Sequence, residues 1–156
     1  MFEIKKRKTF KSKKMYTEKQ VEYQPWGDNI LVAVYGTLRQ GLGNHGRLVG
    51  AELLSTEQIE GFGMKDMGFP AIYDKKGGEI TIEVYRTISD DQRRGLDALE
   101  GYRDGGTFYD RKLVDTSQGK AWIYFMSEEG VSHLDPIKDG DYKNHVERRR
   151  KANASS

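Results

Sequence analysis

The sequence predicts one α+β domain in which strands predominate, and three observations support that prediction. The chain has 156 residues, which suits one domain built around one hydrophobic core. Five short runs of apolar or alternating residues have the length of strands and lie near glycines. Only one segment carries clear start and stop signals of a helix, whereas a doubly wound parallel sheet needs several helices. Hydrophobic residues at 36% supply enough bulk for a core, which excludes a wholly disordered chain.

The clearest strand is the continuous apolar run Ile30–Tyr35, which is typical of a buried strand. Residues Glu79–Thr87 alternate instead, and this pattern places Ile80, Ile82 and Val84 on one face. Three further runs are strand candidates: Phe69–Tyr73, Tyr109–Asp115 and Ala121–Met126. The last two are close enough in sequence to be joined by a turn at Gly119.

The predicted helix spans Asp90–Glu100. Ser89 is a suitable N-cap, and Gln92 stands at the spacing of a capping box. Two aspartates in the first turn favour the positive end of the helix dipole. Gly101 supplies the C-terminal stop, and Leu96 faces the body of the domain.

Two glycine-rich stretches are predicted to be loops. Residues Gly41–Gly46 fit the string G-x-G-x-x-G, but a dinucleotide site needs that string directly after a strand and at the start of a helix. Residues Arg47–Leu53 form only a short candidate helix that Gly50 interrupts, so a nucleotide-binding interpretation is rejected. The glycine- and methionine-rich stretch Gly61–Gly68 predicts a pliable lip.

The two ends of the chain are basic and the middle is acidic. Residues 1–20 carry eight Lys or Arg against two Glu, and residues 143–156 carry five against one. We therefore expect a basic N-terminal extension over 1–28, a domain over 29–142 and a basic C-terminal tail over 143–156. Such charge runs are typical of flexible arms. The alternative is contact with nucleic acid or another acidic partner, because a dense cationic segment gains affinity by releasing counterions.

Several classes of protein are excluded or disfavoured by residue usage. The longest apolar run has six residues, far below the roughly 20 that a membrane-spanning helix needs. The chain has no cysteine, which removes disulfides and cysteine-based zinc sites and is consistent with a cytoplasmic location. Its three histidines show no metal-ligand spacing. We expect no metal, no cofactor and no membrane.

The segment Tyr35-Gly36-Thr37-Leu38 is the first candidate for a binding site. A buried strand ends there, so successive backbone N–H groups lose their ladder partners and can point toward a carboxylate or an oxyanion. The alternative is that the chain simply leaves the strand at this point and the segment binds no ligand.

Glu100 is the second candidate. It closes the predicted helix, where the dipole disfavours a negative charge and raises the carboxylate pKa, and partial burial would raise the pKa further. A carboxyl group poised in this way suits a general acid or base working near neutral pH. The alternative is a solvated carboxylate on a surface helix.

Tyr109 and Arg111 form a third candidate at the start of a predicted strand. The tyrosine can supply a hydroxyl to a site and the arginine can brace it. Core packing and an ion pair at the rim explain the same two residues equally well.

Taken in order, these segments resemble the gamma-glutamylcyclotransferase-like superfamily, most of all its gamma-glutamylamine cyclotransferase and AIG2-like branch. The resemblance covers roughly residues 30–127 and rests on Val34-Tyr35-Gly36-Thr37-Leu38-Arg39, Gly41, Asn44-His45, Phe69-Pro70-Ala71, Gly78-Glu79, Val84-Tyr85, Leu96-Asp97, Glu100-Gly101, Tyr109, Arg111, Ala121 and Tyr124. It implies an α+β fold with a small mixed β-barrel, flanking short helices and a cavity at one mouth.

The resemblance also implies an activity and a set of site residues. Glu100 falls on the family's essential glutamate, and residues Tyr35, Gly36, Thr37 and Leu38 fall on the segment that holds the γ-glutamyl group, with Tyr109 and Arg111 as further substrate contacts. The implied reaction needs no cofactor: the α-amine of a γ-glutamyl group attacks its own γ-carbonyl and releases 5-oxoproline and a free amine or amino acid. The alternative is a non-catalytic binding or regulatory module on the same fold, with its basic tails on nucleic acid or an acidic partner.

Overall fold

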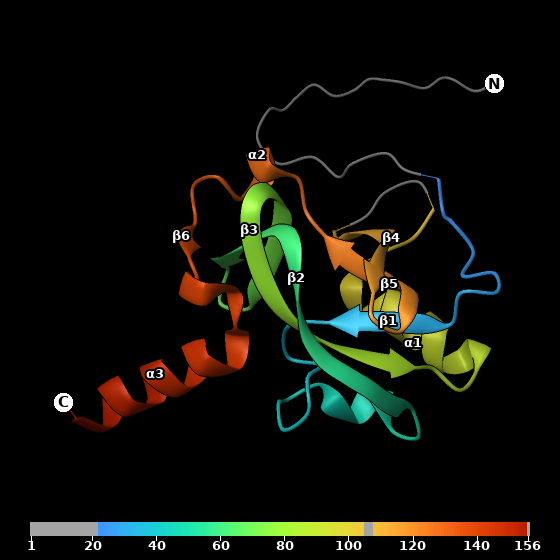
Figure 1. Ribbon diagram of the computed structural model, residues 1–156, viewed down its shortest axis with the longest axis horizontal. Helices are drawn as coiled ribbons and strands as arrows, with labels where there is room; N and C mark the ends of the chain where they lie inside the picture. Colours follow the sequence, from blue (N-terminus) through green and yellow to red (C-terminus); the bar gives the residue numbers. More distant parts are fainter. Residues whose placement is uncertain (1–21, 105–107, 156) are drawn as a thin grey trace.

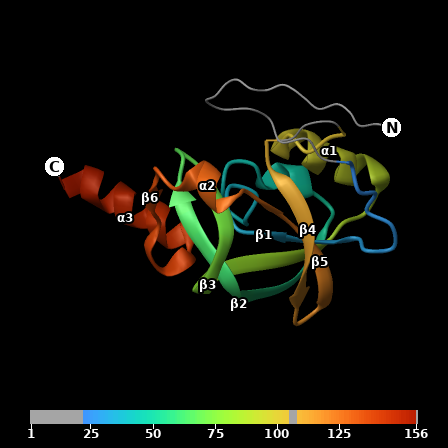
Figure 2. The same cartoon turned by 90° about the horizontal axis from the view of Figure 1, so that it is seen from above.

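A six-stranded sheet organises the protein, as the computed structural model shows for residues 22–104 and 108–155. The elements are β1 (Leu31–Val34), η1 (His45–Leu48), β2 (Glu52–Asp66), β3 (Pro70–Arg86), α1 (Asp90–Glu100), β4 (Asp110–Thr116), β5 (Gly119–Phe125), α2 (Glu128–Val131), β6 (Asp135–Pro136), η2 (Lys138–Gly140) and α3 (Tyr142–Ser155). The strand order is β4-β5-β1-β3-β2-β6, and the sheet is mixed because only β1 and β5 run parallel. The sheet curls into a half-barrel flanked by helices (Figures 1 and 2), which confirms the predicted fold class.

The hairpin of β2 and β3 is the largest difference from the predicted elements. Phe69–Tyr73 and Glu79–Thr87 belong to one long strand, and β2 was not predicted at all. The expected lip over Gly61–Gly68 lies mostly in β2, where Met64 pairs with Ile72 of β3. The first half of β2 is half-exposed and rich in Glu, Ser, Thr and Gln, so it lacks the apolar alternation that marks a strand. Backbone pairing with β3 makes this segment a strand.

Two hydrophobic clusters lie on the two faces of the sheet, and β1 contributes to both. Val32 and Val34 join the cluster that also holds Leu96 of α1. Ala33 and Tyr35 alternate onto the opposite face of the sheet and join the other cluster. Burial of β1 on both faces explains its continuous apolar sequence, and it places the end of this strand in the interior of the molecule.

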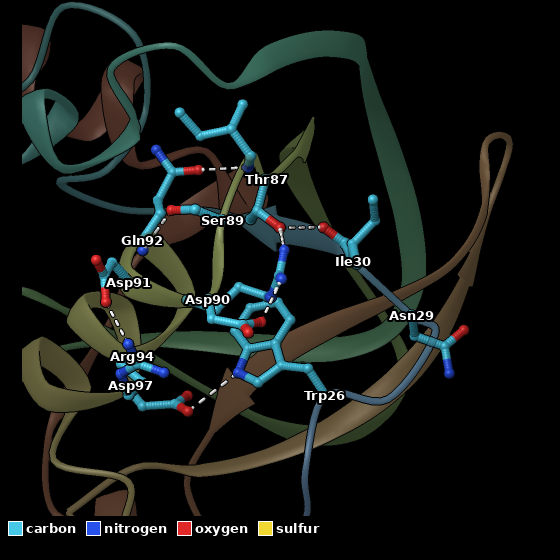
Figure 3. A network of polar contacts seen from close by, with 12 residues as sticks. Trp26, Asn29, Ile30, Thr87, Ser89, Asp90, Asp91, Gln92, Arg94 and Asp97 are labelled. Carbon is cyan, nitrogen blue, oxygen red and sulfur yellow. Dashed lines mark hydrogen bonds and ion pairs between the residues drawn. The ribbon is translucent and has the colours of Figure 1, made fainter.

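Helix α1 forms over the predicted residues, with one change in its cap. Ser89 Oγ accepts a hydrogen bond from the backbone N–H of Gln92 (3.0 Å), as predicted. The Gln92 side chain accepts from the N–H of Ile88 (2.9 Å), one residue before the cap, so the capping box is not reciprocal in its usual form. Figure 3 shows this end of the helix and the Thr87 hydroxyl that donates to the Ile30 carbonyl beside β1 (2.7 Å). The start of α1 is thereby tied to the start of β1.

The C-terminal segment is a helix, which differs from the expectation of a flexible arm. Helix α3 projects from the body (Figures 1 and 2) and is tied to it near its start. Lys143 Nζ lies 3.1 Å from Glu83 Oε2, and His145 Nε2 lies 3.0 Å from Asp66 Oδ2. Three of its arginines also meet carboxylates: Arg148 with Asp139, Arg149 with Asp66, and Arg150 with Glu147. Part of the tail's positive charge is therefore compensated within the protein.

The N-terminal residues 1–21 lie outside the described residues, so partner binding by that extension stays a prediction. Across residues 22–104 and 108–155, no helix combines the length and the apolar character that crossing a membrane requires.

Candidate active site

A cavity of ≈260 Å³ opens where β1 and α1 end. The four residues Tyr35–Leu38 that follow β1 line it, together with Pro70 at the start of β3, Glu100 at the end of α1, and Tyr109 just before β4. These residues are up to 74 positions apart in the sequence. The fold therefore brings the candidate amides and the candidate carboxyl group to one cavity.

The amide side of the cavity is a tight turn. Arg39 N donates to the Gly36 carbonyl (2.9 Å), and the backbone N–H of Asn44 donates to the Thr37 carbonyl (2.8 Å). The Asn44 side-chain amide also donates to Thr37 Oγ1 (2.8 Å), so the turn is held from two sides. Within the described part of the chain, the N–H groups of Gly36, Thr37 and Leu38 make no hydrogen bond. Three amide donors beside one cavity can receive a carboxylate or an oxyanion.

Gly36 occupies its position because no side chain fits there. A Cβ atom on Gly36 would lie 2.5 Å from Pro70 Cγ, well inside van der Waals contact. Pro70 is itself buried and belongs to β3, so it has little room to retreat. The turn and β3 thus meet by direct contact at the wall of the cavity.

Replacing Gly36 by Ala should lower the free energy of unfolding by about 1–3 kcal/mol, because the added methyl group overpacks this contact. Gly43→Ala is the matched control, since a Cβ atom there meets nothing within 4 Å. Urea denaturation of the two variants beside the parent chain measures the difference. Equal stability of the two variants would show that the turn can move away from Pro70.

Among the described residues that line the cavity, Glu100 is the only charged one. Burial raises the pKa of its carboxyl group to about 7, and the negative charge of Asp97, one turn earlier on α1, acts in the same direction. The sequence argument named the helix dipole first and partial burial second, whereas burial is the first cause in the structure. A carboxyl group with this pKa exchanges a proton readily near neutral pH.

The raised pKa has a consequence for stability. Between the unfolded value of 4.5 and the folded value of about 7, the folded protein binds the Glu100 proton more tightly than the unfolded chain does. Stability from this group is therefore present at low pH and is lost as pH rises through about 7. Glu100→Gln should stabilise the protein by about 1–3 kcal/mol at pH 8 and by almost nothing at pH 4.

Denaturation curves at several pH values test this prediction, with Glu79→Gln, an exposed glutamate of β3, as the control. A Glu100→Gln difference that stays constant from pH 4 to 8 would contradict the assigned cause.

Tyr35 and Tyr109 both line the cavity, and neither hydroxyl is ionised at neutral pH. Burial raises the pKa of each phenol well above its ordinary value. The Tyr35 hydroxyl donates to the Tyr124 carbonyl (2.8 Å), and the Tyr109 hydroxyl donates to the Pro70 carbonyl (2.7 Å). The two hydroxyl groups also interact with each other, so both tyrosines form a neutral polar pair beside the cavity.

Arg111 was predicted to contact substrate, and the structure places it elsewhere. Its side chain is fully buried, does not line the cavity and pairs with Asp97 (Nη1 to Oδ1, 3.0 Å). Its guanidinium carbon lies 4.3–5.4 Å from the centres of four aromatic rings: Trp122, Tyr102, Trp26 and Tyr23. A cation enclosed in this way has no path to a ligand, so the predicted role is corrected to one of holding Asp97.

Asp97 collects donors from several segments and was not predicted to do so. Besides Arg111, its carboxylate accepts from the Tyr23 hydroxyl (2.7 Å), the Trp26 indole N–H (3.0 Å) and the Tyr124 hydroxyl (2.6 Å). Figure 3 shows the Trp26 contact. These bonds fix the last turns of α1 against the sheet, three residues before Glu100.

Other cavity residues were not predicted as site residues: Asn44, Phe69, Leu99, Phe108 and Tyr124. Asn44, Phe69 and Tyr124 belong to the motifs that carry the family resemblance, but nothing in the local sequence placed them in the cavity. Leu99 and Phe108 are in none of those motifs, and all five reach the cavity through the tertiary fold. Over the described residues, no group of three His, Asp or Glu side chains is placed to hold a metal ion.

The two walls of the cavity also lie within one region that known proteins share. The sequence profile of the family described as "Gamma-glutamyl cyclotransferase, AIG2-like" matches residues 32–144, which contain both walls. The chain belongs to this AIG2-like gamma-glutamyl cyclotransferase family. The match ends just after the start of α3 and leaves the basic N-terminal segment outside.

Individual relatives agree with the family assignment. The gamma-glutamylcyclotransferase family protein YtfP of Escherichia coli K12 is 33% identical over 111 residues, which are 71% of this chain and 94% of YtfP. The crystal structure of PH0828 from Pyrococcus horikoshii aligns with a TM-score of 0.62 at 28% identity and covers 78% of this chain and 98% of PH0828. A mouse AIG2-like protein shares the fold at 19% identity, with a TM-score of 0.59 over 72% of this chain and 87% of the mouse protein.

Proposed function

We propose that the protein is a γ-glutamyl(amine) cyclotransferase that releases 5-oxoproline from a small γ-glutamyl substrate. The observation that carries the proposal is the shared cavity. Gly36, Thr37 and Leu38, whose amides make no hydrogen bond within the described part of the chain, line it together with Glu100, whose carboxyl pKa is raised to about 7. The family assignment supports this class of reaction and leaves the substrate open.

Glu100 carries the proton in the proposed reaction. The ionised carboxylate takes one proton from the substrate α-ammonium group, which makes that nitrogen a nucleophile. The nitrogen attacks the γ-carbonyl carbon, and a new C–N bond closes the five-membered ring. The old amide C–N bond then breaks, and Glu100 returns the proton to the departing amine. The ring nitrogen gives its second excess proton to the same amine, which leaves as an ammonium ion, so protons balance and the carboxylate is regenerated.

The rest of the cavity holds the substrate in a folded-back conformation. Because nucleophile and carbonyl belong to one molecule, good alignment alone can lower the barrier by on the order of 7 kcal/mol. The amides at Gly36–Leu38 can bind the substrate carboxylate or the developing oxyanion, and a well-placed oxyanion donor contributes about 3 kcal/mol.

Product analysis tests the proposal. The protein is incubated with γ-glutamyl-ε-lysine, γ-glutamyl amino acids, γ-glutamyl alkylamides and glutathione, and 5-oxoproline is measured by liquid chromatography and mass spectrometry. We expect 5-oxoproline from at least one of these classes. Folded protein that forms none from any of them would exclude the cyclotransferase function.

A further inference from the structure

Glu83 is a buried carboxylate that does not line the cavity, and the proposed reaction does not use it. It lies in β3 and is 2% exposed. Among the described residues, its oxygens accept from the backbone N–H of Gln40 (2.8 Å) and the Tyr85 hydroxyl (2.8 Å). They also meet Arg39 Nε (3.0 Å) and Lys143 Nζ (3.1 Å). Burial opposes the negative charge, but these hydrogen bonds outweigh it and hold the pKa of Glu83 below its ordinary value.

The amide segment Tyr35–Leu38 is tied to Glu83 at both of its ends. Val34, the residue before the segment, pairs with Glu83 across the sheet. Arg39 and Gln40, the two residues after the segment, bond to the Glu83 side chain. One position of β3 therefore fixes where the segment begins and where it ends. Loss of the Glu83 charge would release the second of these two ties.

Arg39 extends this contact to the C-terminal helix. It is 4% exposed, and Nη1 of its guanidinium lies 2.9 Å from Asp141 Oδ1. Asp141 directly precedes α3 and accepts from the backbone N–H of Asn144 (3.2 Å), as an N-cap residue does. The rigid fork of an arginine can bind two carboxylates at once, whereas the point charge of a lysine does not reproduce that geometry.

The backbone just before α3 lies directly against β3. A Cβ atom on Gly140 would lie 2.1 Å from the Glu79 carbonyl oxygen, and Gly140 has a φ of +63°. Asp139 has a φ of 60° although it carries a side chain, which is uncommon and persists only where the surrounding structure holds it. The start of α3 is therefore fixed to the strand that carries Glu83.

We infer that Glu83 and Arg39 are positioning residues, which hold the amides of Gly36–Leu38 in the place where the substrate needs them. Asp141 and Lys143 complete this support, so the start of α3 is part of the site and not a separate arm. The effect on turnover rests on the proposed cyclotransferase function, whereas the order of the amide segment does not. An oxyanion donor acts only from the right place, and a displacement of about 1 Å can cost on the order of 100-fold in rate.

NMR relaxation and kinetics on the full chain test the role of Glu83 and Arg39. Glu83→Gln keeps the shape and removes the charge, and Arg39→Lys keeps the charge and loses the fork. In both variants we expect the N–H groups of Gly36–Leu38 to gain motion on the picosecond to nanosecond timescale. We also expect kcat/KM for 5-oxoproline formation to fall at least roughly tenfold. Phe62→Leu, at a buried position of β2 outside the cavity, is the control for a loss of stability alone and should change neither quantity.

The two measurements separate the possible failures. Unchanged relaxation in both variants would overturn the inference, whether or not the parent chain is an enzyme. Increased motion with unchanged kcat/KM would overturn the role of these residues in catalysis. A parent chain that forms no product, with increased motion in the variants, would overturn the proposed function and support the holding of the amide segment by Glu83 and Arg39.

Variants at the start of α3 test the second part of the inference. Asp141→Asn and Lys143→Met should each lower kcat/KM at least roughly threefold. Asn at position 141 can still accept from the N–H of Asn144, so the loss of a helix cap is not the cause. Arg150→Met removes a cation that pairs with Glu147 further along α3 and should leave kcat/KM unchanged. Full kcat/KM in both Asp141→Asn and Lys143→Met would overturn the assignment of α3 to the site.

Discussion

Replacing Glu100 by Gln should lower kcat/KM for 5-oxoproline formation by about 10³-fold, because the amide can neither take the proton from the α-ammonium group nor return it to the leaving amine. Gln has nearly the same shape, so the fold and the cavity should persist, which thermal unfolding and circular dichroism check. Glu79→Gln removes an exposed carboxylate of β3 and serves as the control with activity near that of the parent chain. Retention of more than a tenth of the activity in Glu100→Gln would remove Glu100 from the proposed role.

The pH dependence of kcat/KM is a second test of the role of Glu100. The base must be ionised to act, so kcat/KM of the parent chain should rise with pH and level off above about 7, the pKa of the half-buried Glu100 carboxyl group. The pH dependence of kcat/KM is therefore opposite to that of stability. The free energy of unfolding falls over the same pH interval, because the Glu100 carboxyl group ionises. A carboxylate that lowers stability while it enables the reaction is a common compromise at active sites.

Replacing Arg111 by Met should lower the free energy of unfolding by about 3–5 kcal/mol, since it leaves the buried Asp97 carboxylate without its cation. Arg86→Met is the matched control: it breaks the ion pair with Glu52, whose two side chains are 50% and 64% exposed, and should cost less than about 1 kcal/mol. Chemical denaturation measures both.

The double variant Asp97→Asn with Arg111→Met separates charge from packing. Asn at position 97 keeps one oxygen, which can serve the Tyr23 and Trp26 donors that share Oδ2 but not Tyr124 on Oδ1 as well, and it removes the uncompensated charge. It should regain part of the stability lost in Arg111→Met. If the Arg111→Met and Arg86→Met variants are equally stable, the buried pair does not anchor α1 as described.

Local signals were sufficient wherever residues near in sequence decide the structure. Helix α1 begins at Asp90 and ends at Glu100, as the capping chemistry of Ser89 and Gly101 predicted, and this alone placed Glu100 at a helix terminus. Strand β1 was predicted from its unbroken apolar run, and the loss of its ladder partners after Val34 predicted amides that make no hydrogen bond among the residues that the structure describes. Both halves of the candidate site could therefore be predicted from short stretches of sequence.

Local sequence signals failed where the contact partner of a residue lies far away in the chain. Tyr109 and Arg111 alternate onto one side, yet only Tyr109 reaches the cavity, because four aromatic rings and Asp97 enclose Arg111 inside the core. The basic tail was expected to be an arm, and its contacts with Glu83 and Asp66 hold its first turns against the body. Neither carboxylate is near α3 in sequence.

The sequence by itself determined the chemical groups of this protein: a strand that exposes its amides, a helix that ends in a carboxylate, and the absence of thiol chemistry. Only the tertiary structure decided that those amides and that carboxylate share one cavity, how far the carboxyl pKa rises, and that Phe69 and Phe108 line the same cavity. The physical reason is that residue type and local backbone propensity act over a few neighbouring positions. Burial and the distance between charges depend instead on packing between segments far apart in the chain.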